Sequence, residues 1–284
     1  MSSSYYVPHE TKWPFLATLA LMIMFIGLAN YMNDESTLTL TLTGLGLLLL
    51  VIYGWFSYVV RESEGGLYDD QVDMSFRWGM AWFIFSEVMF FAAFFGALYY
   101  ARELSLPWLG GDGSGVSTNQ ELWPSFENVW PSNGPANYGG DFVVMKAAGI
   151  PALNTIILLI SGLTVTWAHH GLKEGKRNQL VLGLIATVLL GFIFVGFQAY
   201  EYSHAYKDLN LKMTSGIYGS TFYMLTGFHG FHVTLGAIML TVILFRCIRG
   251  HFTNENHFGF EAVAWYWHFV DVVWLGLFVF VYWL

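Results

Sequence analysis

The sequence predicts an all-α integral membrane protein built as a bundle of seven transmembrane helices. Hydrophobic residues make up 55% of the 284 residues and charged residues only 11%, whereas soluble domains usually carry about 25% charged residues. The mean hydropathy of the chain is +0.50. Its apolar residues gather into stretches of about the 20 residues that a bilayer-spanning helix needs. Composition and segment length therefore both place the chain in a membrane.

Seven segments are apolar enough and long enough to cross a bilayer. They are expected at about 15–33, 38–60, 76–101, 150–169, 179–201, 216–246 and 258–284. Short connections join most of them, so neighbours in sequence should pack as antiparallel pairs. We expect an N-terminal two-helix bundle over residues 1–75 and a five-helix bundle over residues 76–284.

Two connecting segments differ from the others. The stretch at about 102–149 is rich in Gly, Pro, Ser, Asn and Trp, which predicts a long outer loop that lies over the bundle. The stretch "RESEGGLYDDQVDMSFR" joins the second span to the third. Because its glycines permit many backbone conformations, we expect it to act as a hinge.

The basic residues predict the orientation of the chain, because cytoplasmic loops carry an excess of Lys and Arg. With the N-terminus inside, eight of the twelve basic residues face the cytoplasm: Lys12, Arg61, Arg77, Lys173, Lys176, Arg177, Arg246 and Arg249. The remaining four face outwards: Arg102, Lys146, Lys207 and Lys212. We therefore expect a cytoplasmic N-terminus and an outer C-terminus.

Charge and motif content exclude several classes of function. A net charge of -8 argues against nucleic-acid binding, which needs a basic face. The single cysteine, Cys247, cannot form an intrachain disulfide and is a poor start for a thiolate metal site. We find no nucleophile elbow, phosphate loop or catalytic triad in the sequence. No catalytic residue is expected in this chain.

Glu87 is the most deeply placed ionisable residue of the predicted spans, in the segment "FRWGMAWFIFSEVMFFAAFFGALYY". It lies ten residues after Arg77, which is about 15 Å along a helix and near the middle of a bilayer. Because burial disfavours the charged form of a carboxyl, Glu87 is expected to be protonated or paired. It either handles protons or ties its helix to a neighbour by a hydrogen bond, and packing is the favoured interpretation.

The last span carries Glu261, Trp265, His268 and Asp271 at intervals of three and four residues. That spacing puts them on one helix face, which we expect to turn inward against the other helices. A polar face of this kind is either a proton path or a set of interhelical hydrogen bonds. The second interpretation is favoured.

Five histidines raise the question of a metal site. His229 and His232 are about 60° apart around their helix, so both could face one neighbour. Membrane metal sites generally need ligands from several helices, each oriented by an outer-shell partner. His169 and His170 lie at the inner end of the fourth span, next to "GLKEGKR". We expect no metal on any of these four residues or on His268.

From the residues alone, three classes of protein remain open. They are a non-catalytic subunit of a larger complex, a transporter of protons or solutes, and an electron carrier with a cofactor. Measured proton movement by the isolated chain would favour the second class. Visible absorbance of a haem or copper centre in the isolated chain would favour the third.

Longer motifs carry a resemblance to a known family. They are "RWGMAWFIFSEVMFFAAFF" (77–95), "IPALNTIILLISGLTVTWAHHGL" (150–172), "GFQAYEY" (196–202), "GIYGSTFYMLTGFHGFHVTLGAIML" (216–240) and "HFGFEAVAWYWHFVDVVWL" (257–275), with "VVRE" (59–62) before them. In this order they resemble subunit III of cytochrome c oxidase, in the haem-copper oxidase family. The resemblance implies a non-redox membrane subunit of the proton-pumping complex that passes electrons from cytochrome c to oxygen.

The resemblance also implies roles for particular residues. Glu87 matches the family's intramembrane carboxyl, and His232 is expected to face it, so that "HGFH" holds a buried acid rather than a metal. Arg61 and Arg246 match residues that hold phospholipid head groups, and we place Trp55 with them. These lipids would fill a V-shaped cleft between the first two helices and the other five. The plain alternative for both arginines is anchoring at the membrane surface.

The implied partners are the catalytic subunit I, subunit II and membrane lipids, with cytochrome c as electron donor and no nucleic acid. Haem and copper are expected in the partner subunits and no cofactor in this chain, which would support proton uptake and the stability of the catalytic subunit. We expect the bacterial cell (inner) membrane, with the mitochondrial inner membrane as alternative. A quinol oxidase subunit III, which usually has five helices, and an independent membrane transporter are the alternative functions. The acidic loop "SEGGLYDDQVD" (63–73) replaces a histidine pair common in relatives, so the lipid head group stays open.

Overall fold

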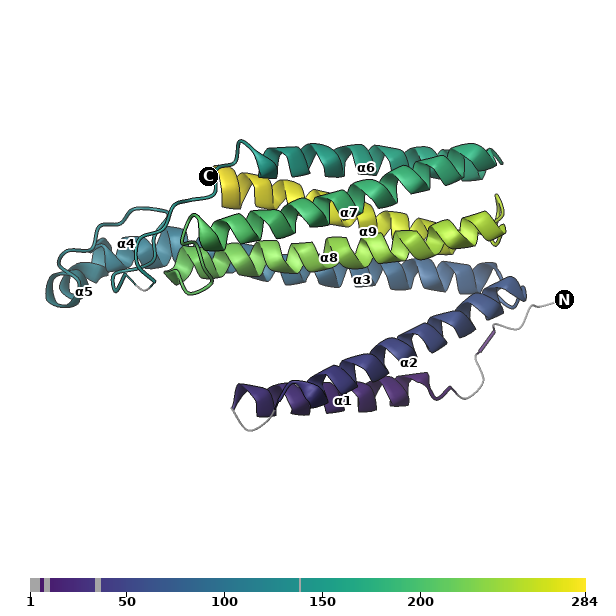
Figure 1. The fold of residues 1–284 in the computed structure, drawn as a ribbon, viewed down its shortest axis with the longest axis horizontal. Coiled ribbons are helices and arrows are strands. Elements are labelled where there is room, and N and C mark those ends of the chain that lie inside the picture. Colours follow the sequence, from purple (N-terminus) through teal and green to yellow (C-terminus); the bar gives the residue numbers. More distant parts are fainter. Residues whose placement is uncertain (1–5, 8–10, 34–36, 138) are drawn as a thin grey trace. The chain divides into compact units, whose positions relative to one another are not determined.

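A computed structural model describes residues 6–7, 11–33, 37–137 and 139–284, and the described residues form helices and loops without a strand (Figure 1). Seven helices among them are long and apolar enough to cross a membrane. The helices of spanning length are α1 (Trp13–Met32), α2 (Thr39–Glu64), α3 (Asp70–Tyr99), α6 (Ile150–Lys173), α7 (Arg177–Lys207), α8 (Gly216–Arg249) and α9 (Phe258–Leu277). The predicted fold class and the seven predicted spans are confirmed.

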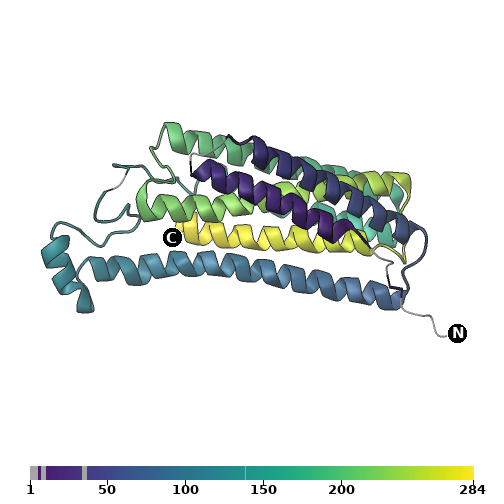
Figure 2. The same cartoon turned by 90° about the horizontal axis from the view of Figure 1, so that it is seen from below.

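The third span is longer than predicted and shortens the expected hinge. α3 begins at Asp70 and passes through a π-helical turn, Tyr100–Ser105, into α4 (Leu106–Leu109), as Figure 2 shows. Its start is capped, because the Asp69 carboxylate accepts a hydrogen bond from the backbone N–H of Val72 at 2.9 Å. Acidic residues in the first turn also suit the positive end of the helix dipole. The second half of the predicted hinge, from Asp70 onwards, is therefore helical.

The chain divides into two compact units, Met1–Trp78 and Gly79–Leu284, with the boundary inside α3. In the first unit α1 and α2 pack at backbone distance. A Cβ added to Gly27 would lie 2.4 Å from the backbone nitrogen of Thr41, and one added to Gly44 would lie 2.3 Å from that of Met24. Small residues allow this close approach of membrane helices.

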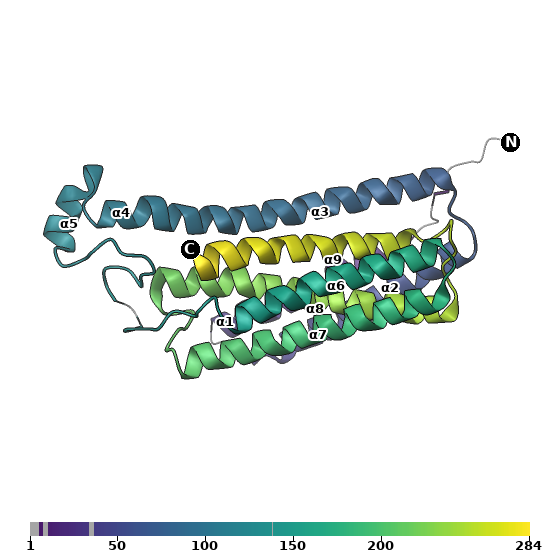
Figure 3. The ribbon, with the colours of Figure 1, turned by 90° about the horizontal axis from the view of Figure 1, so that it is seen from above.

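The second unit packs α6 to α9 around a core of large aromatic side chains. α9 contacts both α6 and α8, and α7 contacts α6 and α8 (Figure 3). Trp267 and Trp274 of α9 are fully buried. Their indole N–H groups donate hydrogen bonds of 2.9 Å to the hydroxyls of Ser161 and Thr155 on α6. The polar atom of each buried indole is thus satisfied, as burial requires.

The outer segment is partly helical and is tied to the ends of α7 and α8. It contains α4 and α5 (Val116–Leu122), whereas the sequence predicts a loop over the whole of 102–149. Further along, the backbone of Val143 donates to the carbonyl of Leu209 at 2.9 Å, and that of Tyr218 donates to the carbonyl of Ser132 at 3.1 Å. These bonds fix the second half of the segment on the bundle.

Candidate functional site

The structure brings Glu87 of α3 and His232 of α8 together. The Glu87 Oε2 atom lies 2.9 Å from the Nε2 atom of His232. The side chains are 22% and 9% exposed, respectively. Both residues belong to the second unit, and this is the arrangement that the resemblance implies for them.

The hydrogen bonds of His232 determine where the protons of this pair can be. Its Nδ1 atom lies 2.6 Å from the carbonyl oxygen of Phe228. A carbonyl oxygen only accepts, so Nδ1 must carry a hydrogen. The short contact between Nε2 and Glu87 then needs one more proton, which resides either on the carboxyl or on Nε2. The pair can therefore hold one proton and pass it over 2.9 Å.

Aromatic rings surround this pair. Phe91, Tyr266 and Phe269 lie around the imidazole of His232, with ring centroids 5.0, 6.2 and 6.4 Å away. Apolar surroundings of this kind strengthen a hydrogen bond, because they lower the local dielectric constant. The pair is thus a local polar contact in an otherwise apolar environment.

His229 does not join the pair, which corrects the expectation that both histidines face one neighbour. Its Nε2 atom lies 3.2 Å from the carbonyl oxygen of Val270 on α9. Its ring packs on Trp274 with centroids 5.0 Å apart. The rotation of about 60° between the two positions is enough to direct them to different helices. His229 is fully buried and packs α8 against α9.

The polar residues of α9 follow its border with α6. Glu261 and Asp271 are buried, but the His268 side chain is 46% exposed, so the expected inward turn of the whole face is wrong for His268. The physical reason is that Trp267 and Trp274, both fully buried, bring more apolar area into the core from an adjacent face. His268 instead lies at the side of α6, where its Nε2 atom is 3.3 Å from the hydroxyl of Thr166.

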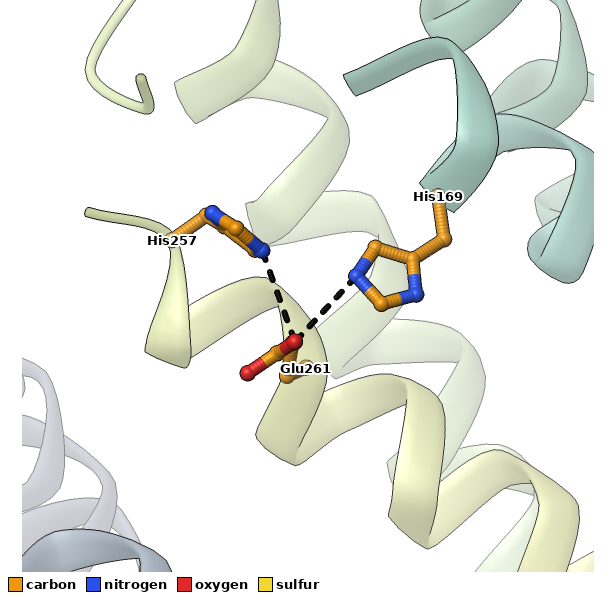
Figure 4. Close-up of side chains that lie close together, drawn as sticks. All are labelled: His169, His257 and Glu261. Atoms are coloured by element: carbon orange, nitrogen blue, oxygen red, sulfur yellow. Dashed lines mark ion pairs between the residues drawn. The ribbon is translucent and has the colours of Figure 1, made fainter. Parts of the chain in front are cut away.

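A third group of side chains joins α6 to the start of α9 and is not predicted from the sequence. His169 comes from α6, His257 is the N-cap residue of α9, and Glu261 lies in the first turn of α9 (Figure 4). The Nε2 atoms of both histidines lie 3.4 Å from the Oε1 atom of Glu261. The signal that could reveal half of this group is the spacing of four residues between His257 and Glu261.

Another buried carboxyl lies between α7 and the π-helical segment Phe278–Trp283 that follows α9. Glu201 is fully buried and accepts a hydrogen bond of 2.6 Å from the hydroxyl of Tyr282. It belongs to the motif "GFQAYEY", which gave no indication of this partner. We assign it a packing role, because the bond joins the last turn of the final span to α7.

The first unit holds its own carboxyl cluster next to one of the expected lipid residues. Glu62 accepts hydrogen bonds from the hydroxyls of Tyr6 at 2.6 Å and Tyr68 at 2.8 Å. The hydrogen bond to Glu62 raises the pKa of Tyr6 to about 12. Burial and the bond to Glu62 raise the pKa of Tyr68 as well. Both phenols therefore remain neutral donors at physiological pH.

Arg61, Trp55 and Arg246, the expected lipid residues, are found in different surroundings. Arg61 borders a cavity of about 260 Å³ whose other lining residues are Trp13, Tyr53, Gly54, Ser57 and Tyr58. Trp55 is half-buried on α2 and does not line that cavity. In the second unit, the guanidinium of Arg246 lies over the ring of Phe252, 4.3 Å from its centroid.

Comparison with known proteins assigns this chain and its relatives to a single family. The family model of cytochrome c oxidase subunit III matches residues 3–284. Proteins named cytochrome c oxidase subunit 3 from Gadus morhua and Carassius auratus are each 43% identical over 281 residues, which covers 99% of this chain and 97% of theirs. The protein of that name from Chondrus crispus is 42% identical over 286 residues, covering 98% of this chain and 93% of its own.

Proposed function

The chain belongs to the cytochrome c oxidase subunit III family, and from this premise we propose that it supports proton uptake, binds lipid and stabilises the catalytic subunit. As a member of this family it is a multi-pass membrane subunit of an oxidoreductase complex. The observation that carries the proposal is the contact of 2.9 Å between Glu87 and His232. It gives an otherwise apolar span one group that can hold a proton.

We propose that the Glu87–His232 pair stabilises the bundle and takes part in proton support. The single proton shared between Oε2 and Nε2 can be held on either atom without movement of the helices. A nearby change of charge in the membrane would shift it from one to the other, because Coulomb interactions are strong where the dielectric constant is low. The tie between α3 and α8 persists in both states, since one proton suffices for the bond.

We further propose that Arg61 and Arg246 bind phospholipid phosphates. The guanidinium fork matches phosphate oxygens in two parallel hydrogen bonds. The cavity beside Arg61 offers tyrosine hydroxyls as further donors. The V-shaped lipid cleft between the first two helices and the other five remains a proposal that rests on the family resemblance.

We propose that haem and copper lie in the partner subunits I and II and that cytochrome c is the electron donor. The two N-terminal helices α1 and α2 favour the cytochrome c enzyme over a quinol oxidase. The bacterial cell membrane is the proposed location, and the mitochondrial inner membrane is the alternative. Activity assays on membrane fractions of the source cell, with reduced cytochrome c and with quinol as electron donor, distinguish the cytochrome c enzyme from the quinol oxidase.

The test compares the purified oxidase with and without this chain. Removal should leave the initial rate of cytochrome c oxidation largely intact, because the redox centres are proposed to lie elsewhere, but should shorten the period of activity during turnover. The paired replacement Arg61→Ala and Arg246→Ala should remove bound phospholipid and shorten the same period. The half-buried Arg102, expected on the outer side, provides the control variant Arg102→Ala. Unchanged lipid content and lifetime in the double variant would refute the lipid role.

A further inference from the structure

The cluster of His169, His257 and Glu261 has the chemistry of a transition-metal site. Two imidazoles and one carboxylate form a ligand set that suits zinc, with a fourth position open to water. One ligand atom from each residue lies within 4.8 Å of the other two. As Figure 4 shows, both rings turn an edge towards the carboxylate of Glu261.

The distances fit a metal better than they fit direct hydrogen bonds. Both Nε2 atoms lie 3.4 Å from the Oε1 atom of Glu261. Ligands that are each 2.0–2.1 Å from a tetrahedral zinc ion are about 3.3 Å from one another. Hydrogen bonds between nitrogen and oxygen are usually about 2.9 Å long. Two edges of the required tetrahedron are therefore already present.

The hydrogen bonding of His257 leaves a lone pair directed at the cluster. Its Nδ1 atom lies 3.2 Å from the carbonyl oxygen of Thr253, which can only accept, so Nδ1 carries the hydrogen of a neutral ring. The Nε2 atom then points a lone pair towards Glu261. A second-shell bond of this kind, from the far ring nitrogen to a carbonyl, is the usual way of orienting a metal-bound histidine.

The two Nε2 atoms of the cluster are buried. The side chains of His257 and Glu261 are only 8% and 11% exposed, and that of His169 is 22% exposed. Neither Nε2 atom has a hydrogen-bond partner among the described residues. A single proton can bridge only one imidazole to the carboxylate, whereas one divalent cation can accept lone pairs from both imidazoles at once.

We infer that His169, His257 and Glu261 form a binding site for Zn²⁺ that joins the end of α6 to the start of α9. From the sequence alone we expect no metal at His169, because no complete ligand set is visible in the sequence. The fold supplies the two other ligands. The cluster does not include Glu87 or His232, so a negative result for zinc binding would not affect the proposed function.

The inference is tested by Zn²⁺ titration of the whole oxidase complex after a chelator wash. The wild type should bind one Zn²⁺ per complex more than His257→Ala or Glu261→Gln. Loss of an outer-shell partner alone weakens metal binding by about 10- to 100-fold, so loss of a ligand should weaken it by more than about 100-fold. The bound ion should also raise the melting temperature of the wild type alone.

His204→Ala is the matched control. His204 and Asp208 form an exposed histidine–carboxylate pair with the same spacing of four residues as His257 and Glu261, and their Nδ1 and Oδ2 atoms are 2.7 Å apart. Among the described residues, this pair is not part of a group of three metal-ligating side chains. This variant should bind as much Zn²⁺ as the wild type. Equal binding by the wild type and the cluster variants would overturn the inference.

A measurement on the wild type covers the case in which the variants fail to assemble. Anomalous diffraction at the zinc edge from Zn²⁺-soaked crystals of the complex should give a peak bounded by the two Nε2 atoms and Oε1. A saturating soak with no peak at this position would overturn the inference without any variant.

Discussion

The two units of the chain stabilise apolar helices in opposite ways. In the most apolar 18-residue stretches of α1 and α2 only 11% and 6% of residues are buried, against 44% in α9. α1 and α2 meet through glycines at backbone distance, while α6 to α9 enclose tryptophans with satisfied indole groups. The first unit therefore leaves most of its apolar surface uncovered by its own side chains, whereas the second unit buries its own core.

This difference predicts which substitutions each unit tolerates. A pair of helices in backbone contact has no room for an added methyl group but loses little when a surface side chain is shortened. A core of interlocking rings loses most when a ring is removed. Substitutions that add volume should therefore destabilise the first unit most, whereas substitutions that remove side-chain contacts should destabilise the second unit most.

Removal of a core ring in the second unit should have the largest effect. Trp267→Ala should lower the free energy of unfolding by about 3–5 kcal/mol, because a fully buried ring is lost and the Ser161 hydroxyl loses its donor. Denaturant unfolding in detergent measures this. Trp283→Ala, at a position that is 71% exposed, should change it by less than about 0.5 kcal/mol. Similar losses for both variants would contradict the description of the core.

Addition of a methyl group in the first unit should have the next largest effect. Gly44→Ala should weaken the packing of α1 on α2 by about 1–3 kcal/mol, since the new Cβ would lie 2.3 Å from a backbone nitrogen. Gly46→Ala on the same helix meets no atom within 4 Å and should be neutral. Thermal unfolding of the two variants separates these expectations, and equal behaviour would show that α1 and α2 do not meet at Gly44.

Replacement of Glu87 tests whether a partly buried polar contact stabilises the second unit as its aromatic rings do. Glu87→Gln should keep most assembly, because an amide still hydrogen-bonds His232, whereas Glu87→Ala should cost about 1–3 kcal/mol for the unsatisfied imidazole. Glu103→Ala, at a side chain that is 51% exposed, is the control on the continuation of α3. The yield of assembled complex and its melting temperature report the result. Equal yields of the Gln and Ala variants would count against the pair.

The smallest effect concerns pH and the tyrosines of the first unit. The pKa of Tyr6 is raised to about 12, above the value of about 10 for a free tyrosine. A raised folded-state pKa means that the contribution to stability is complete below pH 10 and is lost as the pH rises through 12. Tyrosinate absorbance should show two phenols that titrate earlier in Glu62→Gln than in the wild type. The neighbouring variant Glu64→Gln should leave the titration unchanged.

The sequence predicts the spans well because hydrophobicity and length alone decide them. It gives the wrong orientation for His268 on α9, because the spacing of the polar residues does not show which face buries the most apolar area. Trp267 and Trp274 bury more, and their face turns to the core. The sequence also misses the contact of His169 with His257. His257 lies just before the apolar run of α9, and its partner is on another helix, so only tertiary packing brings them together. The Glu87–His232 contact was implied by family resemblance, and neither spacing nor burial identifies it.

The π-helical segment Phe278–Trp283 makes the last span sensitive to chain length. A π turn closes its hydrogen bond one residue later than an α turn. A return to α geometry at the present chain length would leave one residue too many in this turn and would rotate the following positions by about 100°. Tyr282 would then turn away from Glu201, which it now reaches over 2.6 Å. At this end of the bundle, the residue count matters more than residue type in deciding which side chain fills the position next to a buried acid.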